Sequence, residues 1–308
     1  MKILLVGCGV WGRAILRDLC QMSLDVWVFD PSSQARQGAL AEGAERVFCD
    51  PLAAESTAFS TLDGIILATP TSGHAQDLER WWALGIPLFV EKPLFANLCD
   101  FDVLKHAPAG ICIHVMHIWR YHPALIAMRD AIADGALGEV QLVRTERLGW
   151  TSPRQDVGSI PNLLIHDLSI ADLLIGQLPV VSSAHLERDA MGVERWGQIV
   201  LQQPELPLVS MEFGNRSPWK SRLIRIQGTE GAFVFDESRD PAVHWFKGDA
   251  QTPMSRTTTC QLAFDGSTTA LQNELRAWLN FLAGGHEPET TPEQALRYAR
   301  VLATIAAH

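Results

Sequence analysis

The chain has 308 residues, 47% of them hydrophobic and 19% charged, which is more than one core usually serves and excludes an extended disordered protein. Its formal net charge of -10, without a run of Lys or Arg, argues against nucleic acid and against an anionic membrane surface as partners. We expect a soluble protein of two domains, with a small molecule as its partner.

A glycine-rich turn lies near the start of the chain. An apolar run over residues 2–7 predicts a strand that leads into this turn. The turn comprises Gly7, Cys8, Gly9, Val10, Trp11 and Gly12. With a predicted helix over 11–21 and a second strand over 24–30, it completes a unit typical of dinucleotide binding. The glycines permit a tight turn, close approach of a pyrophosphate and close packing of helix and strand, while the helix N-terminus attracts phosphate. Glycine turns alone also serve ordinary packing, so the prediction depends on the complete unit.

A carboxylate, Asp30, ends the second predicted strand. In a dinucleotide site it would accept hydrogen bonds from the adenosine ribose and repel a 2′-phosphate. The residues that follow, 31–33, contain no arginine to bind such a phosphate, and only Arg36 lies near enough to reverse the preference. The sequence therefore favours NAD over NADP.

Apolar runs alternate with helical patterns up to about residue 118, which predicts an α/β domain with a doubly wound parallel sheet of the Rossmann type. Strands are predicted at 2–7, 24–30, 45–48, 63–68, 86–90 and 110–116. Helices are predicted at 11–21, 33–42, 73–84 and 98–105. We place the first domain at residues 1–118.

The pattern changes after Pro123. One helix, 124–134, is followed by strand-like runs at 139–147, 180–187, 196–202, 207–213, 222–227 and 231–236. Because most of these runs lack intervening helices, they predict an antiparallel sheet. Helices at 268–283 and 292–306 complete a second domain, 119–308, so the fold class is α/β plus α+β.

Glu91, Lys92 and Pro93 follow the fifth predicted strand. Ligands of open α/β sheets bind at the carboxyl ends of the strands, so we interpret Lys92 as a group that takes or gives a proton near a bound nicotinamide. The alternative is a surface lysine paired with Glu91.

An apolar segment in the second domain carries another polar cluster. Asn162 and His166 are four residues apart in a predicted helix that ends at Gly176, so they share one helical face. We interpret His166 as a second proton carrier. The alternative is a core histidine satisfied by a backbone carbonyl, and Asp167 is interpreted as a helix-start residue that interacts with the helix dipole.

Loops near this cluster supply further candidates for binding substrate. Trp150 and Trp219 are predicted in loops where a flat ring could stack on a sugar, although interfaces also collect tryptophan. Arg154 could anchor a carboxylate or diphosphate, and the alternative is a solvated loop arginine.

Five motifs together resemble the glucose-fructose oxidoreductase/inositol dehydrogenase family (Gfo/Idh/MocA) in order and spacing. They are the glycine turn with Asp30, Thr69-Pro70-Thr71 with His74, Glu91-Lys92-Pro93, Arg120-Tyr121-His122-Pro123, and the His-Asp-x-Ser-Ile segment that starts at His166. The resemblance spans nearly the whole chain. It implies an N-terminal Rossmann domain, a C-terminal open-faced antiparallel sheet that often mediates oligomers, and NAD(P)-dependent oxidation or reduction at a sugar or cyclitol carbon.

The resemblance also implies residue roles. Lys92 matches the family lysine that handles the hydroxyl proton, and His166 matches the catalytic histidine. The family commonly has Asp where this chain has Asn162, an amide that orients a substrate but takes no proton. Expected substrate-binding residues are Asn162, Arg154, Trp150 and Tyr121. Expected cofactor-binding residues are Gly7, Gly9, Val10, Trp11, Gly12, Asp30, Thr69, Pro70, His74, Glu91 and Lys92.

These observations predict an NAD-dependent oxidoreductase that transfers hydride at a secondary alcohol or ketone carbon of a sugar, sugar derivative or nucleotide sugar. One alternative is an imine or ketone reductase acting on a non-sugar metabolite. The other is a non-catalytic NAD-responsive binding protein, against which the presence of both Lys92 and His166 argues.

The remaining sequence features concern location and assembly. The six cysteines show no C-x-x-C pair or zinc spacing, so we expect reduced thiols, no metal and a cytoplasmic location. A strand that starts at residue 2 leaves no room for a signal peptide, and no apolar stretch approaches the ~20 residues of a spanning helix. The family resemblance implies a homo-oligomer, either a dimer or a tetramer.

Overall fold

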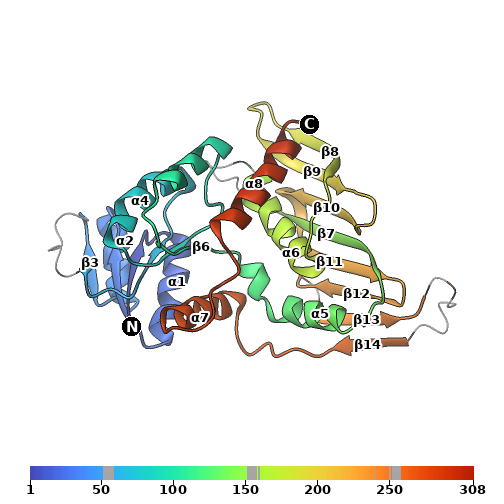
Figure 1. The fold of residues 1–308 in the computed structure, drawn as a ribbon, viewed down its shortest axis with the longest axis horizontal. Helices are drawn as coiled ribbons and strands as arrows, with labels where there is room; N and C mark the ends of the chain where they lie inside the picture. Colours follow the sequence, from blue (N-terminus) through green and yellow to red (C-terminus); the bar gives the residue numbers. More distant parts are fainter. Residues whose placement is uncertain (51–58, 151–157, 159, 239, 250, 252–257) are drawn as a thin grey trace. The chain divides into compact units, whose positions relative to one another are not determined.

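The computed structural model describes the whole chain except residues 51–58, 151–157, 159, 239, 250 and 252–257. Its contacts divide the chain into two compact units. The first unit contains residues 1–117 and 271–297, and the second contains 118–270 and 298–308. Each unit has a β-sheet of its own (Figure 1).

The first unit is built on a parallel sheet with strand order β3-β2-β1-β4-β5-β6. Its strands are β1 (Lys2–Val6), β2 (Asp25–Phe29), β3 (Arg46–Phe48), β4 (Gly64–Leu67), β5 (Leu88–Val90) and β6 (Ile113–Val115). Residues of β4 and β5 are all buried, as parallel strands covered on both faces should be. This strand order is that of the doubly wound Rossmann fold, so the predicted fold class of this part is confirmed.

Helices connect these strands. The α-helices are α1 (Val10–Gln21), α2 (Ser33–Ala41) and α4 (His74–Trp81), and the 3-10 segments are η1 (Thr71–Gly73), η2 (Trp82–Leu84) and η3 (Leu98–His106). α1 buries Ile15, Leu16 and Leu19, which are spaced to form one apolar stripe toward the sheet. α2 begins where the Ser32 hydroxyl accepts the N–H of Ala35, an ordinary N-terminal cap.

A helix from the end of the chain, α7 (Ala270–Leu282), also belongs to the first unit from residue 271 onward. The Trp278 ring stacks on Phe89 of β5, with 5.2 Å between the ring centroids. It also lies against Gly64, where an added Cβ would come within 2.4 Å of the indole. The sequence analysis placed one boundary near residue 118 and left this helix in the second domain, whereas its apolar face packs with the parallel sheet.

The second unit is built on an eight-stranded sheet with strand order β14-β13-β12-β11-β7-β10-β9-β8. Its strands are β7 (Val140–Trp150), β8 (Val181–Arg188), β9 (Glu194–Leu201), β10 (Leu208–Gly214), β11 (Arg216–Gly228), β12 (Gly231–Asp236), β13 (Asp240–Lys247) and β14 (Thr258–Leu262). Neighbouring strands are antiparallel except for β7 and β10, which pair in parallel. The antiparallel prediction therefore holds for the sheet except at this central pair.

Three local expectations for this sheet need correction. β13 and β14 form two strands that the sequence analysis did not predict. Trp219 lies within β11, and Trp150 is the last residue of β7, so neither stands in a loop. Trp150 pairs with Arg216 at one end of a register shift between β7 and β11, and Trp219 lies within the shifted stretch between Arg216 and Ser221.

The helical segments of the second unit are η4 (Ile118–Tyr121), α5 (Pro123–Ala133), the π-helical turn η5 (Ile160–Leu164), α6 (Ile165–Ile175) and the second part of α8 (Pro292–Ala306). α5 and α6 lie against one face of the sheet (Figure 1). α6 ends at Gly176, whose φ of +76° is the left-handed conformation that glycine adopts readily. Nine of the eleven residues of α6 are buried, so this helix crosses the middle of the hydrophobic core.

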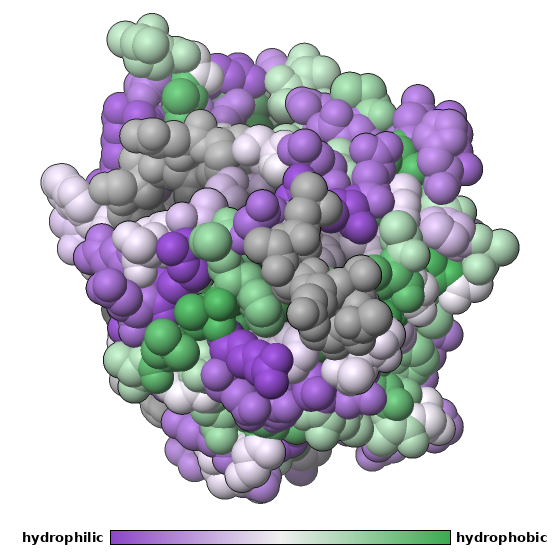
Figure 2. Space-filling view, turned by 90° about the vertical axis from the view of Figure 1, so that its left-hand side faces the viewer, coloured by the Kyte–Doolittle hydropathy of each residue, from purple (hydrophilic) through white to green (hydrophobic). Residues whose placement is uncertain are grey.

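The surface is mixed in character. On the face shown in Figure 2, apolar areas are interspersed among hydrophilic residues. Among the residues that the structure describes, no helix is long and apolar enough to cross a membrane.

Candidate active site

The glycine turn has the geometry that its three glycines require. Gly7 has a φ of +88°, and a Cβ there would come within 2.8 Å of the Ala68 carbonyl oxygen. A Cβ on Gly12 would come within 2.2 Å of the Gly7 carbonyl oxygen. A Cβ on Gly9, in contrast, meets nothing within 4 Å among the described residues, so this position faces open space. α1 begins directly after Gly9 without a side-chain cap, which leaves its first N–H groups suited to a phosphate.

Asp30 is held by main-chain donors at the end of β2. One carboxylate oxygen accepts the N–H of Cys8 and the other accepts the N–H of Ser32, each at 2.8 Å. Arg36 donates to the carbonyl oxygens of Asp30 and Pro31, at 2.7 and 2.9 Å. The carboxylate is therefore fixed beside the glycine turn, and the arginine binds the main chain.

A pocket of about 490 Å³ lies beside the turn, within the size range of small-molecule sites. Its lining includes Gly9 and Val10 of the turn and Ser32 and Ala35 at the start of α2. Val10 is 93% exposed, so an apolar side chain stands at the entrance of α1. Burial, and to a smaller extent the Asp30 charge, raises the pKa of the Cys8 thiol to about 11, so this thiol stays protonated at neutral pH. The turn, the carboxylate and the pocket fit a dinucleotide.

His74 joins two segments of the first unit. Its side chain is fully buried, with Nδ1 3.0 Å from the Leu94 carbonyl oxygen and Nε2 3.0 Å from the Thr69 carbonyl oxygen. Burial lowers the pKa of His74, and the two carbonyl oxygens oppose that shift. The Thr69 hydroxyl donates to Asp77 at 2.6 Å, while Pro70 is exposed. The contacts of His74 are thus with the main chain after β4 and after β5.

Glu91 and Lys92 lie where β5 ends. The Glu91 N–H donates to the Leu67 carbonyl oxygen at 2.9 Å, which aligns this segment with the end of β4. Lys92 is half-buried, and its peptide bond to Pro93 is cis. In a parallel sheet the carboxyl ends of all strands meet at one edge, so Lys92 follows β5 at the edge where the glycine turn follows β1.

A carboxyl group that the sequence analysis missed lies in the same unit. Glu274 of α7 is fully buried, and its Oε1 accepts the N–H of His117 at 2.5 Å. Burial raises the pKa of Glu274 well above its usual range, and the Glu91 charge adds to this effect. A sequence signal existed, because Leu271, Glu274, Leu275 and Trp278 follow the i, i+3, i+4, i+7 spacing of a buried helical face.

In the second unit, Asn162 and His166 lie on either side of a change in helix type. Asn162 is in the π-helical turn η5, where its N–H donates to the Gly158 carbonyl oxygen at 3.2 Å. His166 is the second residue of α6 and is partly buried. A π-helical turn closes through longer-range bonds than an α-helix. Such turns occur frequently at functional sites.

Asp167, the neighbour of His166, forms a buried ion pair. Arg147 of β7 donates to its two carboxylate oxygens at 2.8 and 3.2 Å, and both side chains are at most 5% exposed. The Arg147 guanidinium also lies over the Trp119 ring, 4.7 Å from its centroid. Asp167 lies in the first turn of α6, as expected of a helix-start residue, and its side chain also binds an arginine of the sheet. Arg147 was missed.

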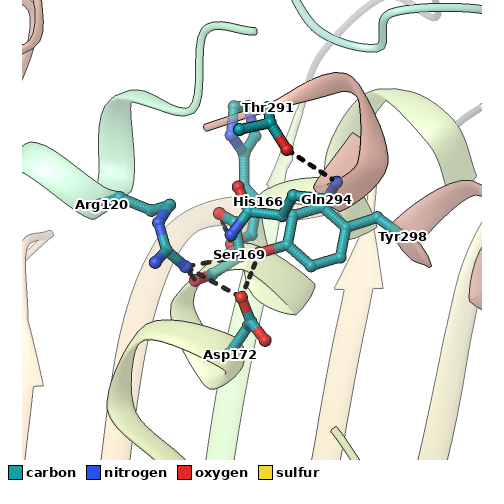
Figure 3. Close-up of polar contacts among 7 residues, drawn as sticks. All are labelled: Arg120, His166, Ser169, Asp172, Thr291, Gln294 and Tyr298. Atoms are coloured by element: carbon teal, nitrogen blue, oxygen red, sulfur yellow. Dashed lines mark hydrogen bonds and ion pairs between the residues drawn. The ribbon is translucent and has the colours of Figure 1, made fainter. Parts of the chain in front are cut away.

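A second buried cluster holds the middle of α6. Arg120 of η4 donates to Asp172 at 3.0 Å, and the Tyr298 hydroxyl of α8 donates to the same carboxylate oxygen at 2.6 Å. Figure 3 shows these three side chains pointing toward one another, with Ser169 beside them. None of them is more than 9% exposed. The position of Arg120 in its motif did not indicate these contacts.

The other predicted residues are distributed as follows. Trp150 is 78% exposed and Trp219 is 56% exposed, while Tyr121 is half-buried in η4. Arg154 lies outside the described residues. Within the described part of the chain, no group of three or more His, Cys, Asp or Glu side chains could hold a metal ion.

Comparisons with known proteins agree with this geometry. Residues 1–109 match the model of an oxidoreductase family with an NAD-binding Rossmann fold, and residues 125–234 match the GFO/IDH/MocA C-terminal domain.

Two curated relatives and one solved structure illustrate the similarity. Inositol 2-dehydrogenase of Rhizobium meliloti is 25% identical over 246 residues, which is 75% of this chain and 73% of that protein. UDP-N-acetylglucosamine 3-dehydrogenase of Acidithiobacillus ferrooxidans is 28% identical over 183 residues, 58% of this chain and 56% of that protein. A levoglucosan dehydrogenase in complex with NADH and levoglucosan superposes with a TM-score of 0.83 at 17% identity, covering 100% of this chain and 97% of that chain.

The two matched models follow one another along the chain in the order of its two sheets. The glycine turn, the fixed Asp30 carboxylate and the Lys92 segment all lie in the part that matches the NAD-binding model. This chain belongs to the Gfo/Idh/MocA family of NAD-binding oxidoreductases.

Proposed function

We propose that the protein oxidises a secondary alcohol of a sugar-like substrate with NAD⁺, or reduces the corresponding ketone with NADH. The observation that carries this proposal is the place of Lys92, directly after β5 at the sheet edge that also holds the glycine turn. Support comes from relatives whose names describe dehydrogenases of inositol and UDP-N-acetylglucosamine.

The proposed chemistry removes two hydrogens from one CH–OH group. Bound NAD⁺ supplies an acceptor for the hydride that leaves the carbon. Lys92 takes the hydroxyl proton, and His166 assists or relays it. Asn162 orients a neighbouring hydroxyl through its amide. In the reducing direction the same residues return the proton to the carbonyl oxygen.

The geometry around Asp30 favours NAD over NADP. The carboxylate is fixed at the end of β2 by two main-chain donors, so a 2′-phosphate placed there would meet a negative charge. Arg36 donates through its Nη1 to two main-chain carbonyl oxygens. Arg13, which lines the pocket, is paired with Glu42.

The central test uses NAD⁺ with inositol, UDP-N-acetylglucosamine and levoglucosan, followed by NADH absorbance. With the substrate that the wild-type enzyme oxidises fastest, Lys92→Met is expected to lower kcat by at least about 100-fold, because general acid-base catalysis contributes that much or more. NADH affinity, measured by fluorescence, is expected to stay nearly unchanged. His166→Gln is expected to lower kcat as well.

Lys105→Met is the matched control, because Lys105 is 73% exposed and pairs only with nearby Asp102 among the contacts described. It is expected to leave kcat and NADH affinity unchanged. A Lys92→Met variant with wild-type kcat would show that the proposed role of Lys92 is wrong.

Cofactor choice has its own test. Asp30→Asn keeps an oxygen that accepts a hydrogen bond but removes the charge, and we expect the preference for NAD⁺ over NADP⁺ in kcat/KM to fall by about tenfold. Arg36→Gln is expected to leave the ratio unchanged. If Arg36→Gln instead abolishes use of NADP⁺ while Asp30→Asn has no effect, the arginine and not the carboxylate sets the preference.

A further inference from the structure

We propose that Tyr298, together with Asp172 and Arg120, is a positioning residue that fixes His166 for proton transfer. The inference rests on the proposed role of His166 and deepens it. Tyr298, Asp172 and Arg120 come from α8, α6 and η4, which are far apart in the sequence but belong to the same compact unit.

The burial of α6 determines what its polar side chains require. Because nearly all of this helix is buried, polar side chains on it need partners inside the protein. Asp172 receives two, the Arg120 guanidinium at 3.0 Å and the Tyr298 hydroxyl at 2.6 Å. The same Arg120 nitrogen lies 3.4 Å from the Tyr298 oxygen, so the phenol both donates to the carboxylate and accepts from the arginine (Figure 3).

Further polar contacts connect this cluster to His166. Arg120 donates to the Ser169 carbonyl oxygen at 3.4 Å, and the Ser169 hydroxyl donates to the His166 carbonyl oxygen at 2.8 Å. Ser169 is the fifth residue of α6, about one turn after His166. A continuous set of polar contacts therefore runs from the phenol of Tyr298 to the main chain of His166.

A second attachment lies on the other side of His166. Asp167 binds Arg147, and Arg147 lies over Trp119, the neighbour of Arg120 in η4. The backbone of His166 thus lies between two buried arginine contacts that both involve η4. Such a histidine has a defined position, and a displacement on the order of 1 Å at a catalytic group can lower turnover 100-fold.

The phenolic hydroxyl of Tyr298 can be removed while the ion pair stays in place. Tyr298→Phe leaves the ring and the Arg120–Asp172 pair but deletes one donor to the carboxylate. Leu302→Ala is the matched control, since Leu302 is a buried residue one turn further along α8 that contributes packing alone. Both variants are expected to melt at lower temperature than the wild type.

Two readouts separate positioning from stability. With the substrate identified by the panel above, Tyr298→Phe is expected to lower kcat about tenfold with KM nearly unchanged, whereas Leu302→Ala keeps kcat. Without any substrate, ¹H–¹⁵N imidazole spectra recorded over a pH series report on His166 directly, with its signal identified by loss in His166→Gln. Tyr298→Phe is expected to shift this signal and its titration midpoint, and Leu302→Ala is not.

A double-variant cycle decides the pathway. Tyr298→Phe is introduced into the wild-type protein and into the His166→Gln variant. If it lowers kcat in the wild-type background but causes no further loss of kcat in the His166→Gln background, its effect passes through His166. An equal loss of kcat in both backgrounds overturns the inference and leaves the proposed function intact. A Tyr298→Phe protein with wild-type kcat and an unchanged His166 signal has the same meaning. If His166→Gln itself keeps wild-type kcat, the proposed role of His166 fails, and the imidazole spectra alone then decide whether Tyr298 positions the ring.

Discussion

The two units hold their polar groups in different ways. In the first unit, Asp30 and Glu274 accept main-chain N–H groups, and the ring of His74 faces main-chain carbonyl oxygens. In the second unit, Asp167 and Asp172 bind the side chains of arginines. Burial of a carboxyl group can therefore be accompanied by a raised pKa, which favours the protonated form as at Glu274, or by an ion pair with a guanidinium.

This difference has a consequence for how each unit responds to change. The energy of a group that is held by main-chain contacts depends on the local path of the backbone. For Glu274, whose pKa is raised, it also depends on pH. A group held by a distant arginine depends on one partner side chain, and loss of that partner leaves a buried charge. Substitutions in the two units should therefore differ in size and in pH dependence.

The largest effect is expected for Arg147→Met in the second unit. This change leaves the Asp167 carboxylate buried without its arginine, which should lower the free energy of unfolding by about 3–5 kcal/mol. Urea denaturation measures it. In the double variant Arg147→Met/Asp167→Asn much of the loss should be recovered, because the buried charge is removed as well. A single variant within about 1 kcal/mol of the wild type would contradict the role given to the pair.

An intermediate effect is expected from the glycine turn of the first unit. Gly12→Ala places a Cβ against the Gly7 carbonyl oxygen and should cost about 1–3 kcal/mol of stability. Gly9→Ala meets open space and should change stability little, yet it should weaken NADH binding because the Cβ points where a pyrophosphate approaches. Thermal melting and NADH fluorescence measure the two properties. Equal melting temperatures for the two variants would argue against this account of the turn.

The smallest effect is expected for Glu274→Gln, and it should depend on pH. The pKa of Glu274 is raised in the folded state, so unfolding releases its proton once the pH exceeds the usual value of 4.5. Wild-type stability therefore falls as pH rises from 4.5 toward the raised pKa, whereas glutamine has no proton to release. The variant should gain stability over the wild type as pH rises, as measured by urea denaturation across that window. Glu79→Gln, at an exposed position, serves as control, and a pH-independent difference for Glu274→Gln would oppose the prediction.

The same contrast explains what the sequence could predict. The glycine turn, Asp30 and Lys92 are recognisable because each motif is local, and its spacing follows from one strand, one turn and one helix. The π-helical turn that contains Asn162 was not predictable, because the spacing of apolar residues does not distinguish a π-helical turn from an α-helix. The sheet class of the second unit followed from runs without helices, but periodicity does not say which strands pair, so the parallel β7–β10 pair was missed.

Contacts between distant side chains were out of reach for a related reason. Arg120 and Asp172 are 52 residues apart, and Asp172 and Tyr298 are 126 residues apart. A pattern shows that a helix face is buried but does not name its partner, and the same limit concealed the packing of Trp278 on Phe89. Glu274 was missed for a different reason, because the sequence did carry a signal for it: a carboxyl group on an apolar helical face.

The division of the chain bears on how the protein is made. The first unit includes residues 271–297, which a ribosome delivers only after residues 118–270 of the second unit have been synthesised. Until then, Gly64 and Phe89 lack the indole of Trp278 that covers them. The strands of both sheets are therefore synthesised before either unit has its full core, since the second unit also takes Tyr298, Leu302 and Ile305 from the end of the chain. The N-terminal sheet cannot complete its packing first, as N-terminal domains usually do during synthesis.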